Sequence, residues 1–204
     1  MITPKSHPQE SVRKSERQGS RRIFDKEKGT LIAKDLFHQR GFDAVGIAEL
    51  TRTLGINPPS LYAAYGSKVN LFEMCLEAYI AEGNLPADEI LSDGRDTVEA
   101  LSELIQRAAE LYTQSDLKKG CMVAEGLRAD DNKARAVSNK YLELSRIYIK
   151  DFVLQQYPDK ADFLADYIVV TLQGLSAAAF SGLPKARALA VASATGKSVS
   201  YLLS

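Results

Sequence analysis

Apolar residues recur at three- and four-residue steps along most of the chain after residue 22. This spacing places them on one face of a helix, and no alternating strand pattern persists beyond four or five residues. The stripes predict helices at 23–40, 47–54, 58–65, 67–82, 101–112, 130–156, from 158 to 175 and from 184 to 203, with a short apolar piece at 120–126. The sequence therefore predicts an all-α protein of about nine helices.

One segment interrupts this pattern and suggests a change of domain. Residues 83–95 are rich in Gly, Pro and Asp, which is typical of a loop. We therefore predict a flexible arm at 1–22, a first helical domain at 23–82 whose last helix, from 67, connects to the rest, and a second helical domain at 83–204.

Charge changes this picture only at the N-terminus. The whole chain has 26 Lys+Arg and 26 Asp+Glu, so net charge indicates no partner. Residues 1–22 carry six basic side chains and two acidic ones, and six minus two leaves +4. A basic arm beside a domain can bind phosphates, and a solvated tail can have the same composition. Both readings stay open.

The cysteines and the hydropathy pattern narrow the compartment. Cys75 and Cys121 lie in apolar surroundings without a CxxC pair, which favours reduced thiols in a cytoplasmic protein. Two cysteines are too few for a convincing metal site. The N-terminus lacks the apolar core of a secretory signal, and no run of about 18 apolar residues is present. We expect a cytoplasmic protein that does not contact a membrane.

The stretch from Ile47 to Lys68 has the layout of two short helices joined by a tight turn. Gly55 suits the turn, Asn57 can cap the second helix, and prolines are tolerated in its first turn. In a helix-turn-helix the N-terminal end of such a second helix enters the major groove of DNA. A generic helical hairpin that never meets DNA shares the same layout.

The segment GFDAVGIAELTRTLGINPPSLYAAYGSKVNLFEMCLEAY resembles the DNA-binding domain of the tetracycline-repressor (TetR) family of bacterial transcription regulators. The matching positions are Gly41-Phe42, Ile47-Ala48, Gly55-Ile56, Leu61-Tyr62, Tyr65, Lys68 and Leu71. The resemblance covers about residues 23–82, and residues 96–204 match only in helix number and approximate lengths.

Two positions depart from the family pattern. Val45-Gly46 stands where the family usually has a Thr or Ser that caps the second helix and touches a phosphate, so Gly46 is a poorer cap. Tyr65 stands where a phenylalanine is usual; it fills the same core position, and its hydroxyl needs a partner.

The resemblance implies that Tyr62 and Lys68 bind phosphates and that residues 57–64 distinguish bases. Prolines and small residues at the tip allow a close approach to base edges and thymine methyl groups. The predicted DNA-facing set is Asn57, Pro58, Pro59, Ser60, Tyr62, Ala63, Tyr65, Lys68, Arg52 and Gly46.

The resemblance also implies that the second domain binds a small ligand and forms a homodimer. Mixed aromatic, Met and small residues suit an apolar pocket with a few polar groups, although each would equally suit a core. The predicted pocket residues are Cys75, Tyr79, Leu104, Ala108, Tyr112, Cys121, Met122, Tyr141, Tyr148 and Phe152.

The last two helices are rich in small residues, as in LQGLSAAAFSG and ALAVASATG. Small faces let helices approach closely, so we predict a four-helix dimer interface built from these two helices of each subunit, with intrachain packing as the alternative. The predicted interface residues are Leu172, Leu175, Ala178, Ala179, Leu189, Ala192 and Val199.

The expected function is a ligand-responsive repressor that binds a palindromic DNA operator as a homodimer. An enzyme is the first rival: His7 and His38 are the two histidines, and the chain has no GxSxG, HExxH, Walker or dinucleotide motif. We read His38 as a surface residue of its helix. The second rival is a ligand-independent DNA-binding or protein-interaction module. We expect no cofactor and no metal, and an effector of unknown identity.

Overall fold

The computed structural model describes residues 24–83 and 85–204, and they form helices joined by turns and loops, with no strand in these two ranges. The elements are α1 (Lys26–Ala44), α2 (Ile47–Leu54), α3 (Pro58–Tyr65), α4 (Lys68–Ala81), α5 (Ala87–Ile90), α6 (Thr97–Tyr112), α7 (Met122–Gly126), α8 (Asn132–Leu154), the 3-10 turn η1 (Pro158–Lys160), α9 (Ala161–Phe180) and α10 (Lys185–Leu203). The predicted all-α class is confirmed. The predicted arm at 1–22 lies outside the described residues.

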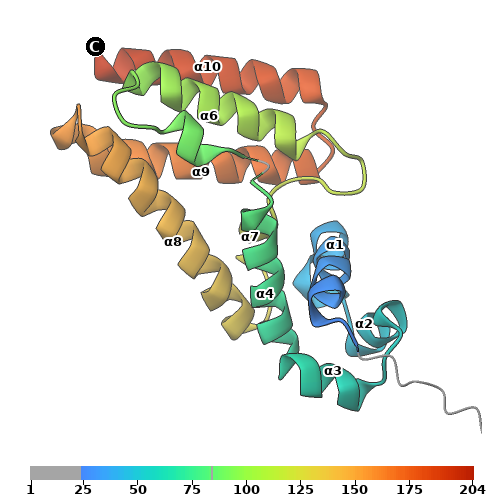
Figure 1. Ribbon diagram of the computed structural model, residues 1–204. Coiled ribbons are helices and arrows are strands. Elements are labelled where there is room, and N and C mark those ends of the chain that lie inside the picture. The colour runs from blue at the N-terminus through green and yellow to red at the C-terminus, as the bar shows by residue number, and fades with distance from the viewer. Residues whose placement is uncertain (1–23, 84) are drawn as a thin grey trace, which may run out of the picture.

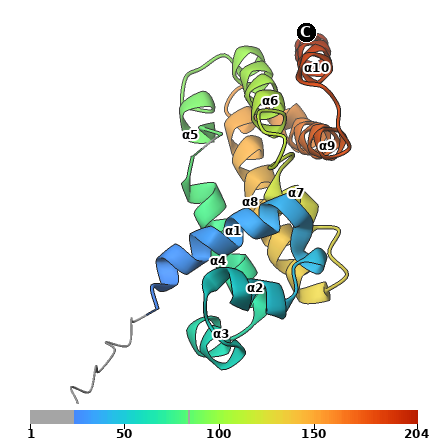
Figure 2. The same ribbon diagram turned by 90° about the vertical axis from the view of Figure 1, so that its right-hand side faces the viewer.

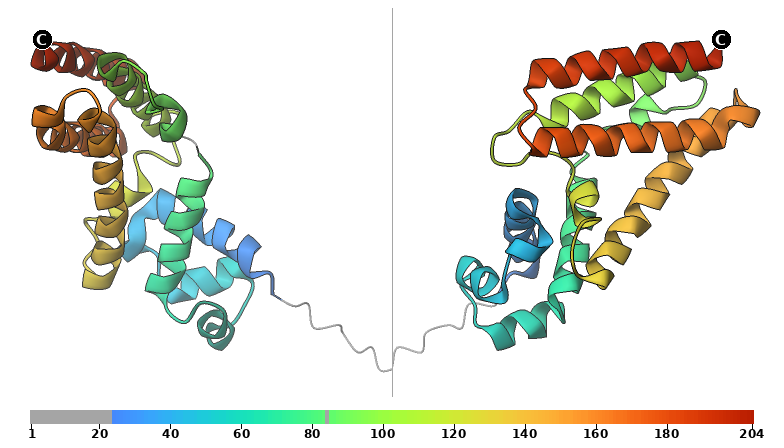
Figure 3. Two further views of the ribbon diagram at one scale, coloured as in Figure 1. Left: turned by 60° about the vertical axis from the view of Figure 1, so that its left-hand side comes forward. Right: turned by 180° about the vertical axis from the view of Figure 1, so that it is seen from behind.

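The helices form two groups that α4 joins (Figure 1). α1, α2 and α3 pack at one end of the molecule, and α6, α9 and α10 run alongside one another at the other end. α4 rises from the first group toward the second, and α8 slants from the middle of the molecule to the far end of α9. The view from behind shows the same arrangement (Figure 3).

Polar side chains begin several of these helices, as the sequence suggested. The Asn57 side chain accepts a hydrogen bond from the Ser60 amide at 2.9 Å, and the Ser67 hydroxyl accepts one from the Asn70 amide at 3.0 Å. These bonds satisfy amides that have no partner within the helix. Gly55 ends α2 in the left-handed region at φ 66°, which a glycine adopts without a steric cost.

The core of the first group extends beyond the predicted domain boundary. Phe37, Phe42 and Phe72 meet ring against ring, with centroids 5.1 to 5.9 Å apart. Met122 and Ala134, from α7 and α8, belong to the same buried cluster. The first group is therefore not closed off at residue 82, because later helices complete its core.

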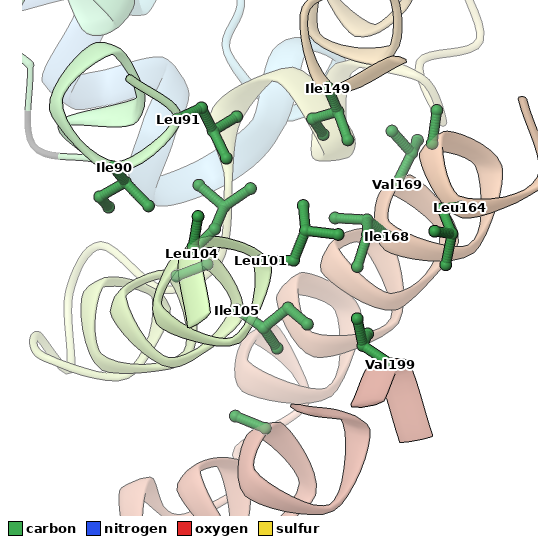
Figure 4. Packing of buried hydrophobic residues seen from close by; sticks show 14 of the residues in the cluster. Ile90, Leu91, Leu101, Leu104, Ile105, Ile149, Leu164, Ile168, Val169 and Val199 are labelled. Carbon is green, nitrogen blue, oxygen red and sulfur yellow. The ribbon is translucent and has the colours of Figure 1, made fainter. Parts of the chain in front are cut away.

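A second buried cluster holds α6, α8, α9 and α10 together (Figure 4). Leu101, Ile105 and Ile168 are fully buried where α6 faces α9. Gly196 of α10 sits against α6, where an added Cβ would lie 2.8 Å from the Ser102 hydroxyl oxygen. A small residue at this position lets the two helices approach closely.

The segment 83–95 is not the plain loop that its composition predicted. α5 forms one turn there, and Ile90 and Leu91 are buried against the second cluster. A helix of four residues leaves no periodic stripe in a sequence, because one turn presents too few positions. Composition predicted the break in the pattern and missed the turn inside it.

Within the described residues one segment, Pro158–Phe180, is long and apolar enough to cross a membrane by length and composition alone. The buried core helix of a soluble protein passes the same test. In this segment 39% of the apolar window is buried, and Leu164, Ile168 and Leu175 pack against neighbouring helices of the same chain.

Candidate nucleic-acid interface and effector cavity

The tip of α3 is open to solvent and stands at one end of the molecule (Figure 1). Asn57, Pro58, Pro59 and Ser60 are all exposed, while Leu61 is fully buried beneath them. Leu50 of α2 is also fully buried, and both leucines belong to the core of the first group, which holds the two short helices together. The predicted base-reading end of α3 is therefore rigidly held and accessible.

The two tyrosines of α3 have different environments. Tyr62 is 47% exposed, and its hydroxyl is free to meet a phosphate oxygen. Tyr65 is 4% exposed, and its hydroxyl donates a hydrogen bond to the Lys26 carbonyl at 2.9 Å. Burial raises the pKa of Tyr65, so the phenol stays protonated. The prediction that Tyr65 faces DNA was wrong, because its side chain fastens α3 to α1.

Lys68 begins α4 and is half-buried rather than extended into solvent. Its ammonium lies 4.0 Å from the centre of the Phe42 ring, a cation–π geometry. Burial lowers the pKa of Lys68, while nearby Asp43 and Asp131 raise it. The cation is thus held in one place, and its predicted role in phosphate binding stays a prediction.

Gly46 directly precedes α2 and Arg52 lies in its last turn, and both residues are exposed. Gly46 makes no side-chain cap, as expected from the departure from the family pattern. Arg52 is exposed, and its guanidinium lies 4.0 Å from Glu49, a weak surface contact. Arg52 can therefore turn toward a phosphate backbone at little cost. Ala63 is exposed as well.

A cavity of about 710 Å³ lies among α4, α5, α6, α7, α8 and α9. Small-molecule sites typically have volumes of about 300–1,000 Å³. Of the ten residues predicted from the sequence, those found in its wall are Tyr79, Leu104, Tyr112, Cys121, Tyr141 and Tyr148.

The other four predicted pocket residues lie outside the cavity wall. Cys75 and Met122 belong to the buried core of the first group, and Ala108 and Phe152 to that of the second. Burial strongly raises the pKa of the Cys75 thiol, whose Sγ lies 3.4 Å from the Thr30 carbonyl oxygen. Helical periodicity finds an inward-facing residue, but it cannot tell a filled interior from a hollow one.

Two phenols and one thiol meet in the cavity wall. Burial raises the pKa of Tyr79, and the adjoining Cys121 side chain raises that pKa further. Burial also raises the pKa of Tyr112, which adjoins the same thiol. Both phenols therefore remain protonated at neutral pH and are neutral hydrogen-bond donors.

The loop between α6 and α7 joins the cavity to α1. Lys118 forms an ion pair with Asp35 of α1 at 2.7 Å, and His38 Nε2 lies 3.3 Å from the Gly120 carbonyl oxygen. The next residue, Cys121, lines the cavity, and its amide donates to the Ser176 hydroxyl at 2.8 Å.

The reading of His38 as a surface residue was wrong. Its ring packs edge-on against Tyr79 with centroids 5.2 Å apart, and burial lowers its pKa. The sequence around His38 gave no sign of these contacts, because the residues that contact His38 come from α4 and from the loop before α7.

The predicted dimer residues divide into several environments. Leu175, Ala179, Ala192 and Val199 are buried within one chain, where the small side chains allow α9 and α10 to pack on α6. For these four the alternative of intrachain packing is correct. Leu172 lines the cavity, Leu189 packs against the same core, and Ala178 is half-buried.

The exposed faces of these two helices carry larger apolar residues instead. On α9 these include Val170 and Phe180, and on α10 Val191 and Tyr201, with exposed fractions from 45% to 81%. α9 and α10 lie side by side along one edge of the molecule, with α6 and α8 on their inner side (Figure 2).

The environments of the two α3 tyrosines predict opposite effects for the same substitution. Tyr65→Phe should lower the free energy of unfolding by about 1 kcal/mol, the typical contribution of one hydrogen bond, and leave DNA affinity unchanged. Tyr62→Phe should weaken binding to all DNA sequences and leave stability unchanged. Denaturant unfolding and fluorescence anisotropy measure the two effects. A stability loss in Tyr62→Phe alone would contradict the assignment.

Comparisons with known proteins agree with this geometry. The sequence profile described as "Bacterial regulatory proteins, tetR family" matches residues 32–75. The HTH-type transcriptional repressor BdcR of Escherichia coli K12 is 40% identical over 185 residues, which cover 91% of this chain and 94% of the relative. The HTH-type transcriptional repressor ComR of the same organism is 25% identical over 197 residues, covering 90% and 92%.

A solved structure extends the likeness to nearly the whole fold. The TetR family transcriptional regulator CifR, a cysteine mutant complexed with 26-base-pair operator DNA, superposes with a TM-score of 0.77 at 26% identity. The match covers 86% of this chain and 97% of that one. From the helix-turn-helix, the cavity behind it and the long match to BdcR, the chain belongs to the tetR family of bacterial regulatory proteins.

Proposed function

We propose that the protein is a cytoplasmic, non-enzymatic repressor that binds a palindromic operator as a homodimer and releases it when a small molecule enters the cavity. The observation that carries the proposal is the exposed, capped tip of α3 at one end of α4, with the cavity at the other end. The 40% identity with the repressor BdcR and the operator complex of CifR support DNA binding. No cofactor or metal enters the proposed mechanism.

α4 is the element that joins the two activities. Lys68, at its start, comes shortly after α3, the proposed recognition helix, and Tyr79 and Ile80, near its end, line the cavity. A ligand that pushes on the end of α4 therefore changes the position of α3. The loop at Lys118 and Gly120 gives a second connection, because it contacts α1 and leads directly into the cavity wall. A modest difference in ligand affinity between two positions of α4 is enough to shift DNA binding.

A homodimer is needed to read a palindrome, because each protomer offers one recognition helix. The exposed apolar faces of α9 and α10 are the surface we assign to the dimer. Exposed apolar patches of this kind on a soluble chain commonly mark a protein–protein contact. The proposed dimer surface uses the same two helices that the sequence predicted, but it uses the residues on their outward faces instead of the predicted ones.

In vitro selection from a random DNA pool at about physiological salt tests the proposed function. We expect an enriched palindrome whose half-sites are separated by about one helical turn of 34–36 Å or by a greater distance. Ser60→Glu is the matched control: a carboxylate in the first turn favours the helix and repels phosphates, so a folded variant should lose the enrichment. Failure of the wild-type dimer to enrich any sequence would contradict the proposal.

The dimer surface has its own test. Val170→Arg should give a monomer at micromolar concentration, because the variant places a charge without a partner in an apolar interface. Val170 is 67% exposed, so the substitution should cost the protomer little stability. Ile147→Arg, on the exposed side of α8, is the matched control and should remain dimeric. A dimeric Val170→Arg protein in light scattering would place the interface elsewhere.

A further inference from the structure

The cavity wall is almost entirely uncharged. Its residues come from six helices and the segments that join them, and Leu104, Ile149 and Val169 are typical of them. Glu77 is the one charged residue among the described residues that line it. An anionic ligand group buried here would therefore meet no Lys, Arg or His side chain among the described residues of the cavity wall.

Glu77 does not set the charge of the interior. It is exposed to solvent, and the Tyr141 hydroxyl donates a hydrogen bond to its carboxylate at 3.0 Å. Because the carboxylate is exposed, water and salt screen its charge from the deeper wall. Beside it the mouth is apolar, with Ile80, Leu144 and Tyr148 each at least 40% exposed.

The polar groups deeper in the wall are neutral. Tyr79 and Tyr112 are phenols whose raised pKa keeps them protonated, and the nearby Cys121 thiol and Gln173 amide add two further uncharged groups. These groups can bond to a carbonyl, hydroxyl or ether oxygen. None of them can compensate the loss of hydration of a full charge.

We propose that the cavity takes an uncharged, mainly hydrocarbon ligand with at most a few neutral oxygen or nitrogen groups, and that it discriminates against phosphate, sulfonate and carboxylate groups. The inference rests on the proposed function, since it names the chemical class of the effector. Burying an ion without a partner costs far more than burying hydrocarbon of the same size. The apolar wall, with only neutral donors in its deeper part, thus disfavours anionic molecules without any specific steric clash.

Two fluorescent probes with one aromatic skeleton test the charge rule on the intact dimer. N-phenyl-1-naphthylamine is neutral, and 8-anilinonaphthalene-1-sulfonate carries one sulfonate on the same skeleton. The neutral probe should bind at one site per protomer with a Kd at least about tenfold lower than that of the sulfonate. Equal or tighter binding of the sulfonate, or no binding of either probe, would overturn the proposal.

A charge added inside the cavity provides the matched test of location. Gln173→Lys places an ammonium in the wall and should lower the Kd of the sulfonate probe about tenfold while weakening the neutral one. Gln155→Lys adds the same charge outside the cavity, near the end of α8, and should leave both Kd values unchanged. Equal effects of the two variants would show that the probes bind elsewhere and would overturn the inference.

Release of DNA is measured separately, by adding the neutral probe to the complex with a selected operator. Tight neutral binding in the cavity without DNA release would leave the ligand class standing and count against the effector role of the site. If the neutral probe releases DNA but the protein does not prefer it over the sulfonate probe, the effector role of the site stands and the proposed ligand class is overturned.

Discussion

The structure depends on one helix that belongs to two environments at once. α4 begins beside the recognition helix, where Lys68 lies over the Phe42 ring, and it ends in the wall of the cavity with Tyr79 and Ile80. Its middle is buried in a core shared with α7 and α8, so it cannot move independently of them. In the proposed mechanism a change at either end of α4 is carried through the helix as a whole, and this packing is the physical basis of the proposed coupling between DNA and ligand.

The tight seating of α3 is what makes that coupling useful. Tyr65 binds the start of α1 through its hydroxyl, and Leu61 is completely buried, so the exposed tip keeps a fixed direction relative to α4. Gly29 of α1 leaves the space that the Tyr65 hydroxyl occupies, because an added Cβ would lie 2.4 Å from it. The small and rigid residues at the tip are the ones proposed to read DNA, and the aromatic Tyr65 behind them fixes their position.

The sequence predicted the positions of most helices, but it predicted less well which residues of different helices contact one another. Caps such as Asn57 and Ser67, and the turn at Gly55, follow from local bonding rules that a sequence displays directly. The packing of His38 on Tyr79 and of Gly196 on α6 depends on helices far apart in the chain, and no local pattern shows it. Periodicity likewise identified inward-facing residues of the second domain. It could not separate residues of the cavity wall from residues of the filled core, or residues of a dimer interface from residues that pack between helices of one chain.

The most direct test of the shared helix is the distance between the two recognition helices of the dimer, measured by double electron–electron resonance. Gln39 of α1 is exposed and lies outside the predicted DNA-facing set, so a spin label at Gln39→Cys, in a Cys121→Ser background, reports the separation of the two DNA-binding groups, since Cys75 is buried. One narrow distance with operator bound, and a shifted or broader distribution with a cavity ligand that lowers operator affinity, is the expected result. Identical distributions in the two states would contradict a mechanism in which α4 carries the signal.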